Sequence, residues 1–132
     1  MNEQEFKRRT KDLALRVIRL VRVLPNETAA DVIARQLLRC ATSVGANYRA
    51  ACRGRSVADV VNKLSIVEEE ADECFYWLEL LAEAEIVSRA RLDSLLTETN
   101  EITAMVVASI KTLRAKNAAI QNPKSKIQNM QS

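Results

Sequence analysis

Residues that interrupt helices are scarce in this sequence, and their scarcity limits the folds open to it. Only 2 glycines and 2 prolines occur among 132 residues. A β-sandwich or β-barrel needs many tight turns, for which glycine and proline are the usual residues, so the sequence argues against both. The length fits one domain, and 48% hydrophobic residues supply enough apolar mass for its core.

The few breakers divide the chain into four segments with helical periodicity. Pro25 interrupts the first pattern and Gly54 ends the second, while Thr28, Ser56 and Ser88 stand where a hydroxyl can cap a new helix. We therefore expect helices near residues 3–24, 28–53, 56–86 and 88–117. Because short links make long amphipathic helices antiparallel neighbours, the pattern predicts an all-α, antiparallel up-down-up-down four-helix bundle.

The predicted bundle covers residues 1–118, and a different segment follows it. When residues are placed at about 100° per step, the apolar residues of each helix fall on one arc, which predicts a shared core. Residues 119–132 are polar, contain Pro123 and show no sustained period. We expect them to form a flexible C-terminal tail.

Charge is strongly segregated along the chain, although the net charge is only +3. Residues 1–55 hold 12 Lys/Arg and 5 Asp/Glu, residues 56–110 hold 3 and 12, and residues 111–132 hold 5 and none. Arginines form stripes opposite the apolar arcs of the first two helices, and guanidinium groups bind phosphate bidentately. They are candidates for binding an RNA or DNA backbone: Arg8, Arg9, Arg16, Arg19, Arg22, Arg35, Arg39, Arg49 and Arg53.

A second interpretation of the arginine stripes remains open. The third helix is rich in acids from Glu68 to Glu83, and the arginines can face these acids within or between subunits. The chain would then be a protein-interaction scaffold whose charges act only between subunits and toward a protein partner. Tyr48 falls on the buried arc, so the aromatic interleaving of single-strand binders is missing.

The third helix has a second apolar side, which predicts self-association. Trp77, Leu80 and Leu81 lie off its core arc, with Ile66 beside them. A helix that is apolar on two sides is usually buried on two sides, and a four-helix monomer covers only one. We expect these four residues to form an oligomer interface.

Composition also excludes several kinds of chemistry. The chain has no histidine, and Cys40, Cys52 and Cys74 form no C-x-x-C pair. We expect no enzymatic activity, no metal site and no cofactor.

The sequence also predicts a cytoplasmic location. The N-terminus lacks the features of a signal peptide, and no stretch is long enough for a membrane span. The cysteines are therefore expected to be reduced.

Several motifs resemble those of a known family. They are ATSVGANYR at 41–49, KLSIVEEEADE at 63–73 and YWLELL at 76–81, with FKRRT at 6–10. Over about residues 5–117 the chain resembles the four helix bundle protein family, also called the 23S rRNA-intervening sequence protein family. The resemblance implies an antiparallel bundle that assembles into a homopentamer, with no catalytic residues. A related group, the accessory proteins of diversity-generating retroelements, consists of basic pentamers that bind nucleic acid and a reverse transcriptase.

Overall fold

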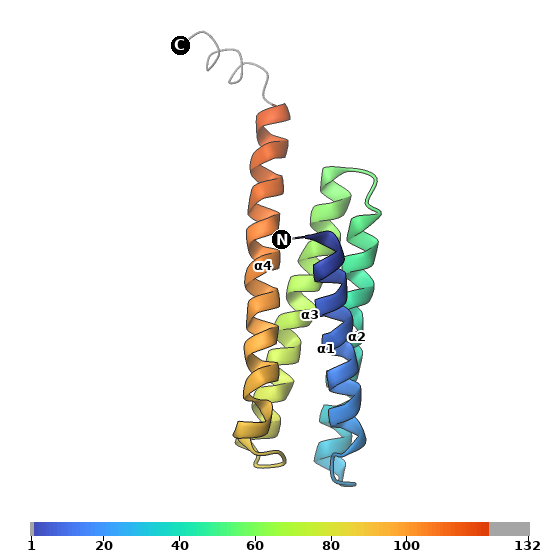
Figure 1. Cartoon of the computed structure of the whole chain (residues 1–132), viewed down its shortest axis with the longest axis vertical. Helices are drawn as coiled ribbons and strands as arrows, with labels where there is room; N and C mark the ends of the chain where they lie inside the picture. The colour runs from blue at the N-terminus through green and yellow to red at the C-terminus, as the bar shows by residue number, and fades with distance from the viewer. Residues whose placement is uncertain (1, 122–132) are drawn as a thin grey trace.

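The computed structural model describes residues 2–121, and this range contains four α-helices and no strand. The helices are α1 (Glu3–Arg22), α2 (Thr28–Cys52), α3 (Val57–Glu83) and α4 (Arg89–Gln121). Consecutive helices run in opposite directions along one long axis (Figure 1). The predicted all-α up-down-up-down bundle is confirmed.

Local hydrogen bonds set the helix starts. Asn2 Oδ1 accepts from the Glu5 amide at 3.1 Å, and Ser56 Oγ accepts from the Asp59 amide at 3.1 Å. The predicted Ser56 cap is therefore confirmed. The predicted Thr28 cap is wrong, because Glu27 holds the capping position of α2 with no side-chain hydrogen bond, and Thr28 is already helical.

The turn between α3 and α4 explains why α3 ends three residues before the predicted end at 86. Glu85 adopts a positive φ of 58°, which breaks the helical path. The amides of Ile86 and Val87 donate to the Leu81 carbonyl at 3.0 and 3.2 Å, so this carbonyl in the last turn of α3 remains bonded. Val87 is buried at this turn and joins the core.

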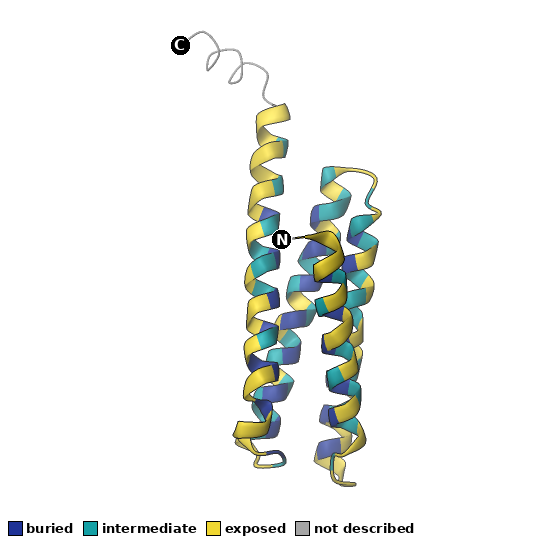
Figure 2. Ribbon diagram, viewed as in Figure 1, coloured by how far each residue is buried: buried dark blue, intermediate teal, exposed yellow. Residues whose placement is uncertain are grey.

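The core lies on the inward arc of all four helices, as the periodicity predicts (Figure 2). Two threonines also lie in it: Thr10 Oγ1 donates to the Phe6 carbonyl at 3.0 Å, and Thr99 Oγ1 donates to the Leu96 carbonyl at 2.9 Å. Each hydroxyl is satisfied within its own helix, so its burial costs little.

Helix α4 is longer than predicted and projects beyond the other three helices (Figures 1 and 2). It continues through Gln121, because no proline or glycine interrupts it and alanines at 118 and 119 favour the helix. The predicted tail thus begins inside α4. The rest of it, residues 122–132, lies outside the described residues.

The helices pack unequally around the core. Helix α3 packs extensively on both α2 and α4, and α1 packs mainly on α2, whereas α1 and α4 touch only lightly. The α1–α4 edge therefore depends on a few side-chain contacts. Within the described residues, no helix combines the length and apolar character needed to cross a membrane.

Candidate nucleic-acid interface

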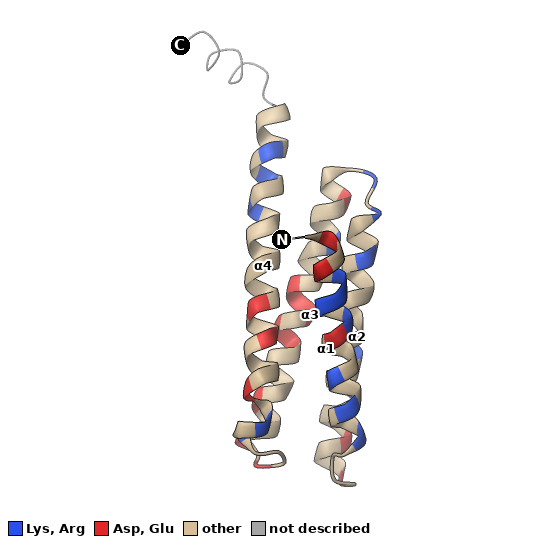
Figure 3. Cartoon of the chain, in the orientation of Figure 1, with Lys and Arg blue, Asp and Glu red and all other residues tan. Residues whose placement is uncertain are grey.

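Seven of the nine candidate arginines are exposed, and six of them point outward without a partner among the described residues. These six are Arg8, Arg19 and Arg22 on α1, Arg35 and Arg49 on α2, and Arg53 at the C-cap of α2. Within residues 2–121, none of their side chains forms an ion pair or a hydrogen bond. Because α1 packs on α2, the two helices together carry a concentration of positive charge, whereas acids gather on α3 and the lower part of α4 (Figure 3). We call these six side chains the basic face.

Arg9 is directed differently, because it lies on the flank of α1 that meets α4. Its Nε donates to Glu98 Oε2 at 3.2 Å, and its Nη2 donates to Glu98 Oε1 and, at 2.8 Å, to Glu101 Oε2. The hydrogen bond to Glu98 is the main reason why the pKa of Arg9 is raised. The guanidinium therefore links α1 to α4. The prediction that Arg9 lies opposite the apolar arc is wrong, and we leave it out of the basic face.

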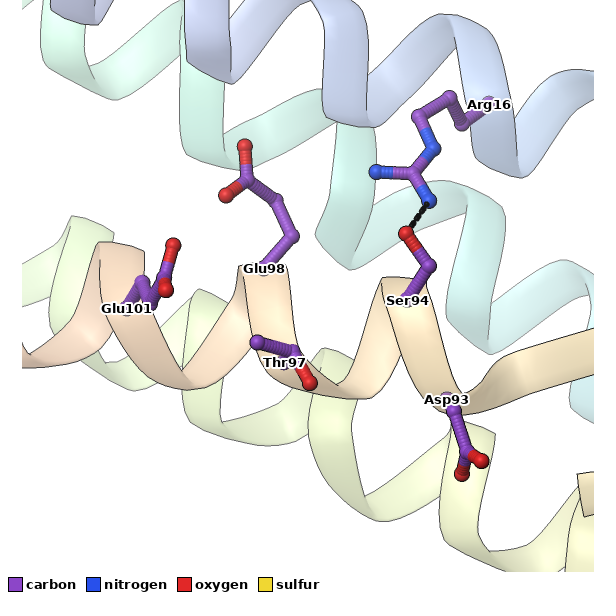
Figure 4. A pocket seen from close by; sticks show the side chains of 6 residues that line it. All are labelled: Arg16, Asp93, Ser94, Thr97, Glu98 and Glu101. Carbon is purple, nitrogen blue, oxygen red and sulfur yellow. Dashed lines mark hydrogen bonds between the residues drawn. The ribbon is translucent and has the colours of Figure 1, made fainter. Parts of the chain in front are cut away.

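Arg16 also turns toward α4, and it too departs from the predicted position opposite the arc. Its Nη2 donates to Ser94 Oγ at 2.7 Å (Figure 4). The hollow beside this contact has a volume of about 370 Å³, and three carboxylates line it: Asp93, Glu98 and Glu101. Because like charges repel, the flank of α1 that faces these α4 carboxylates is unsuited to phosphate.

Arg39 pairs with acids of α3, as the second interpretation of the arginine stripes predicts for all of them. Its Nη1 donates to Glu70 Oε2 at 3.1 Å, and its Nη2 donates to Glu73 Oε2 at 2.6 Å. The hydrogen bond to Glu73 is the main cause of its raised pKa. Arg39 therefore pairs with α3 acids inside one chain, and its charge is already neutralised.

A shallow groove between α1 and α2 extends the basic face. It has a volume of about 320 Å³ and is lined by Lys11 and Arg49 together with small residues: Thr10, Ala14, Thr42, Gly45 and Ala46. Gly45 lies at the close approach of the two helices, since a Cβ added there would be 3.5 Å from the Thr10 carbonyl oxygen. Lys11 was not among the predicted site residues. The sequence signal for Lys11 is the presence of small residues on both helices. They let α1 and α2 approach closely and so bring Lys11 and Arg49 to the same groove.

Tyr48 cannot serve as an exposed stacking platform. It is buried, and its ring packs edge-on against Phe6 with centroids 4.6 Å apart. Burial is also the main reason why the pKa of its hydroxyl is raised well above the ordinary value. The prediction that Tyr48 belongs to the buried arc is confirmed.

Only three of the four residues predicted to form the oligomer interface reach the surface of the chain. Ile66, Trp77 and Leu80 are half-buried, whereas Leu81 is fully buried in the chain's own core. The assignment of Leu81 to an interface is therefore wrong, because the core of this bundle is wider than the arc drawn from α3 alone. Tyr76, which the sequence argument did not select, is 52% exposed and contacts the Trp77 ring edge-on at 5.1 Å.

These features define a class of protein, a small antiparallel four-helix bundle with one basic face. The chain belongs to the 23S rRNA-intervening sequence protein family, whose model matches residues 2–108. It is similar to a crystal structure of a protein with unknown function from the S23 ribosomal protein family of Bacteroides thetaiotaomicron. The two share 38% sequence identity with a TM-score of 0.78, over 84% of this chain and 99% of that chain. No curated protein matches the chain.

Proposed function

We propose that this chain is a non-enzymatic protein that binds RNA or DNA backbones through the basic face. The observation that carries the proposal is the contrast among the arginines. Arg9 and Arg39 pair with carboxylates of the same chain, whereas the six arginines of the basic face have no such partner within the described residues. Their charge is therefore available to an external anion.

The chemistry of the basic face suits phosphate rather than bases. Guanidinium groups bind phosphate oxygens in a fixed fork, and each neutralised phosphate releases counterions to solvent. Tyr48 is buried, so the face offers no aromatic platform for a base. Binding should accordingly be sensitive to salt and nearly indifferent to sequence.

We also propose that the protein self-associates through the outer side of α3. Ile66, Trp77 and Leu80 support this assignment because they are only half-buried in the single chain, and the exposed Tyr76 lies beside them. The family resemblance favours a homopentamer. An oligomer would repeat the basic face and convert weak contacts into useful avidity.

We infer a reducing, cytoplasmic location. All three cysteines are free, and the sulfurs of Cys40 and Cys74 are 3.2 Å apart. Reduced thiols are compatible with this location, because disulfides are rare in cytosolic proteins.

The test of nucleic-acid binding uses two charge-matched variants. The double variant Arg19→Gln/Arg22→Gln removes two exposed cations from the basic face, and the control Arg89→Gln/Arg91→Gln removes two exposed cations from the start of α4. Affinity for duplex DNA, structured RNA and single strands is measured across a salt series. For duplex DNA, the slope of log K against log salt should flatten by about 0.9 for each arginine that contacts a phosphate. The control should retain the wild-type slope.

Three outcomes would contradict the proposal. Equal weakening in both variants would reduce the effect to net charge, and wild-type affinity in the first variant would remove α1 from the site. A wild-type protein that ignores RNA and DNA at low salt would eliminate the function altogether. The scaffold alternative, which the Arg39 pairs with Glu70 and Glu73 favour, predicts instead that the first variant loses assembly. The mass of both variants is therefore measured by light scattering.

A further inference from the structure

We propose that Cys40, Cys74, Glu70 and Glu73 form a binding site for a thiophilic divalent cation of the Zn²⁺ type, between α2 and α3. The Cys40 sulfur and carboxylate oxygens of Glu70 and Glu73 all lie within 4.8 Å of one another. Cys74 adds a second sulfur, which is 3.2 Å from that of Cys40 but lies outside this group of mutually close atoms. This site is independent of the basic face and differs from the sequence-based expectation that the chain holds no metal.

Three of the four ligand atoms, from Cys40, Glu70 and Glu73, lie near the spacing that a tetrahedral ion requires, whereas the Cys74 sulfur would have to move toward the carboxylates. Bond lengths of about 2.3 Å to sulfur and about 2.1 Å to oxygen place two thiolates about 3.8 Å apart in a tetrahedral site. The Cys40 and Cys74 sulfurs would need to separate by only about 0.6 Å from their 3.2 Å spacing. Side-chain rotation can supply this movement.

The site already attracts a cation in the structure. The Arg39 guanidinium bridges Glu70 and Glu73, so both carboxylates are directed at one positive group. The Arg39 side chain is 50% exposed and can swing into solvent. An ion would enter past the partly exposed carboxylates, reach the two buried thiols behind them, and release their two protons as the thiolate bonds form.

The ligand set selects the class of ion. Two sulfurs with two carboxylate oxygens suit a borderline-soft cation such as Zn²⁺, whereas Mg²⁺ and Ca²⁺ prefer oxygen ligands alone. The sequence conceals this grouping because Cys40 and Cys74 are 34 positions apart on different helices. Its one local signal is the position of Glu70, which precedes Glu73 by three residues and Cys74 by four and is therefore a neighbour of each on α3.

The site also contains its own reporter. Trp77, the only tryptophan of the chain, directs its Nε1 toward Glu73 Oε1 at 3.4 Å. An ion that binds Glu73 would alter this contact. The fluorescence of Trp77 should therefore change when the site fills.

The experiment titrates the reduced full-length chain with Cd²⁺ and, by calorimetry, with Zn²⁺. We expect one ion per chain, an ultraviolet thiolate-to-cadmium charge-transfer band and a change in Trp77 fluorescence. Cys40→Ala and Cys74→Ala should each weaken the band strongly, because each removes one of the two sulfur ligands, whereas Cys52→Ala should keep it in full. The double variant Glu70→Gln/Glu73→Gln should bind at least tenfold more weakly, and Arg39→Gln should bind more tightly, because the competing cation is gone.

Several outcomes would overturn the proposal. One is a reduced wild-type protein that gives no band, and another is a band that depends on Cys52. Because the buried cysteine variants can lose stability, their helicity is checked by circular dichroism. The glutamates are partly exposed and their substitution leaves the core intact, so unchanged affinity in the double glutamine variant would overturn the site by itself.

Discussion

At the scale of single residues, the two glycines meet opposite surroundings although neither has a positive φ. A Cβ at Gly45 would lie 3.5 Å from backbone and side-chain atoms of Thr10, which is an ordinary contact. A Cβ at Gly54 would collide with the Val60 side chain and lie 3.1 Å from the Ala51 carbonyl oxygen. The requirement for glycine is therefore steric at position 54 and weak at position 45.

We predict that Gly45→Ala stabilises the bundle and that Gly54→Ala destabilises it. In the interior of α2, alanine should gain up to about 1 kcal/mol over glycine in the free energy of unfolding. At position 54, the displacement of Val60 should cost about 1–2 kcal/mol. Urea unfolding followed by circular dichroism measures both values. A clear loss of stability in Gly45→Ala would show that α1 and α2 approach more closely than the structure indicates.

At the scale of helices, much of the fold could be predicted from the sequence. Periodicity fixed the number of helices and the inward side of each, because apolar burial dominates a bundle of this size. It could not predict which flank of a helix meets a neighbour. Arg8 and Arg9 are adjacent in the sequence, yet Arg8 is exposed and Arg9 pairs with Glu98, since one residue rotates the side chain by about 100°.

The same limit explains the errors in the candidate site. Leu81 lies off the arc calculated for α3 alone, but the wide interior of the bundle covers it. The bridge from Arg39 to Glu70 and Glu73 depends on the register between α2 and α3, which no single helix encodes. Packing between helices sets the positions of Leu81 and Arg39. Among the nine candidate arginines, the sequence therefore predicted the surroundings correctly only for the six of the basic face, which are exposed and unpaired within the described residues.

We predict that Arg9→Met weakens the attachment of α1 to α4. Helices α1 and α4 touch only lightly, and Arg9 supplies ion pairs to both Glu98 and Glu101. Because these side chains are only partly shielded from solvent, the loss in the free energy of unfolding should be about 1–2 kcal/mol. Hydrogen exchange should also quicken in α1 more than in α3.

Arg8→Met is the matched control for this prediction. Arg8 is exposed and forms no ion pair within the described residues, so its replacement should change stability by less than about 0.5 kcal/mol. Equal stability of the two variants would show that the Arg9 pairs contribute nothing to the α1–α4 edge.

At the scale of the whole molecule, the basic face and the proposed oligomer interface occupy different helices. Helices α1 and α2 carry the basic face, and α3 carries acids together with the half-buried Ile66, Trp77 and Leu80 (Figure 3). Association through α3 would leave the arginines of the basic face free for phosphate. The two proposed roles are therefore compatible in one assembly.

Our last prediction separates assembly from folding by means of Tyr76. This side chain is 52% exposed, so Tyr76→Glu should leave the isolated bundle folded while it places a charge in the proposed interface. Trp77→Ala removes a larger anchor, and such truncations often cost about 2 kcal/mol or more at an interface. Light scattering should show smaller species for both variants, with unchanged helicity by circular dichroism. Binding should weaken more for long nucleic acids than for short ones, because avidity requires several basic faces on one assembly.

The control for this prediction is Val32→Glu, which changes an exposed apolar residue of α2 and should retain the wild-type mass. A wild-type chain that is monomeric at micromolar concentration would refute the interface, and smaller species for Val32→Glu alone would move it from α3 to α2.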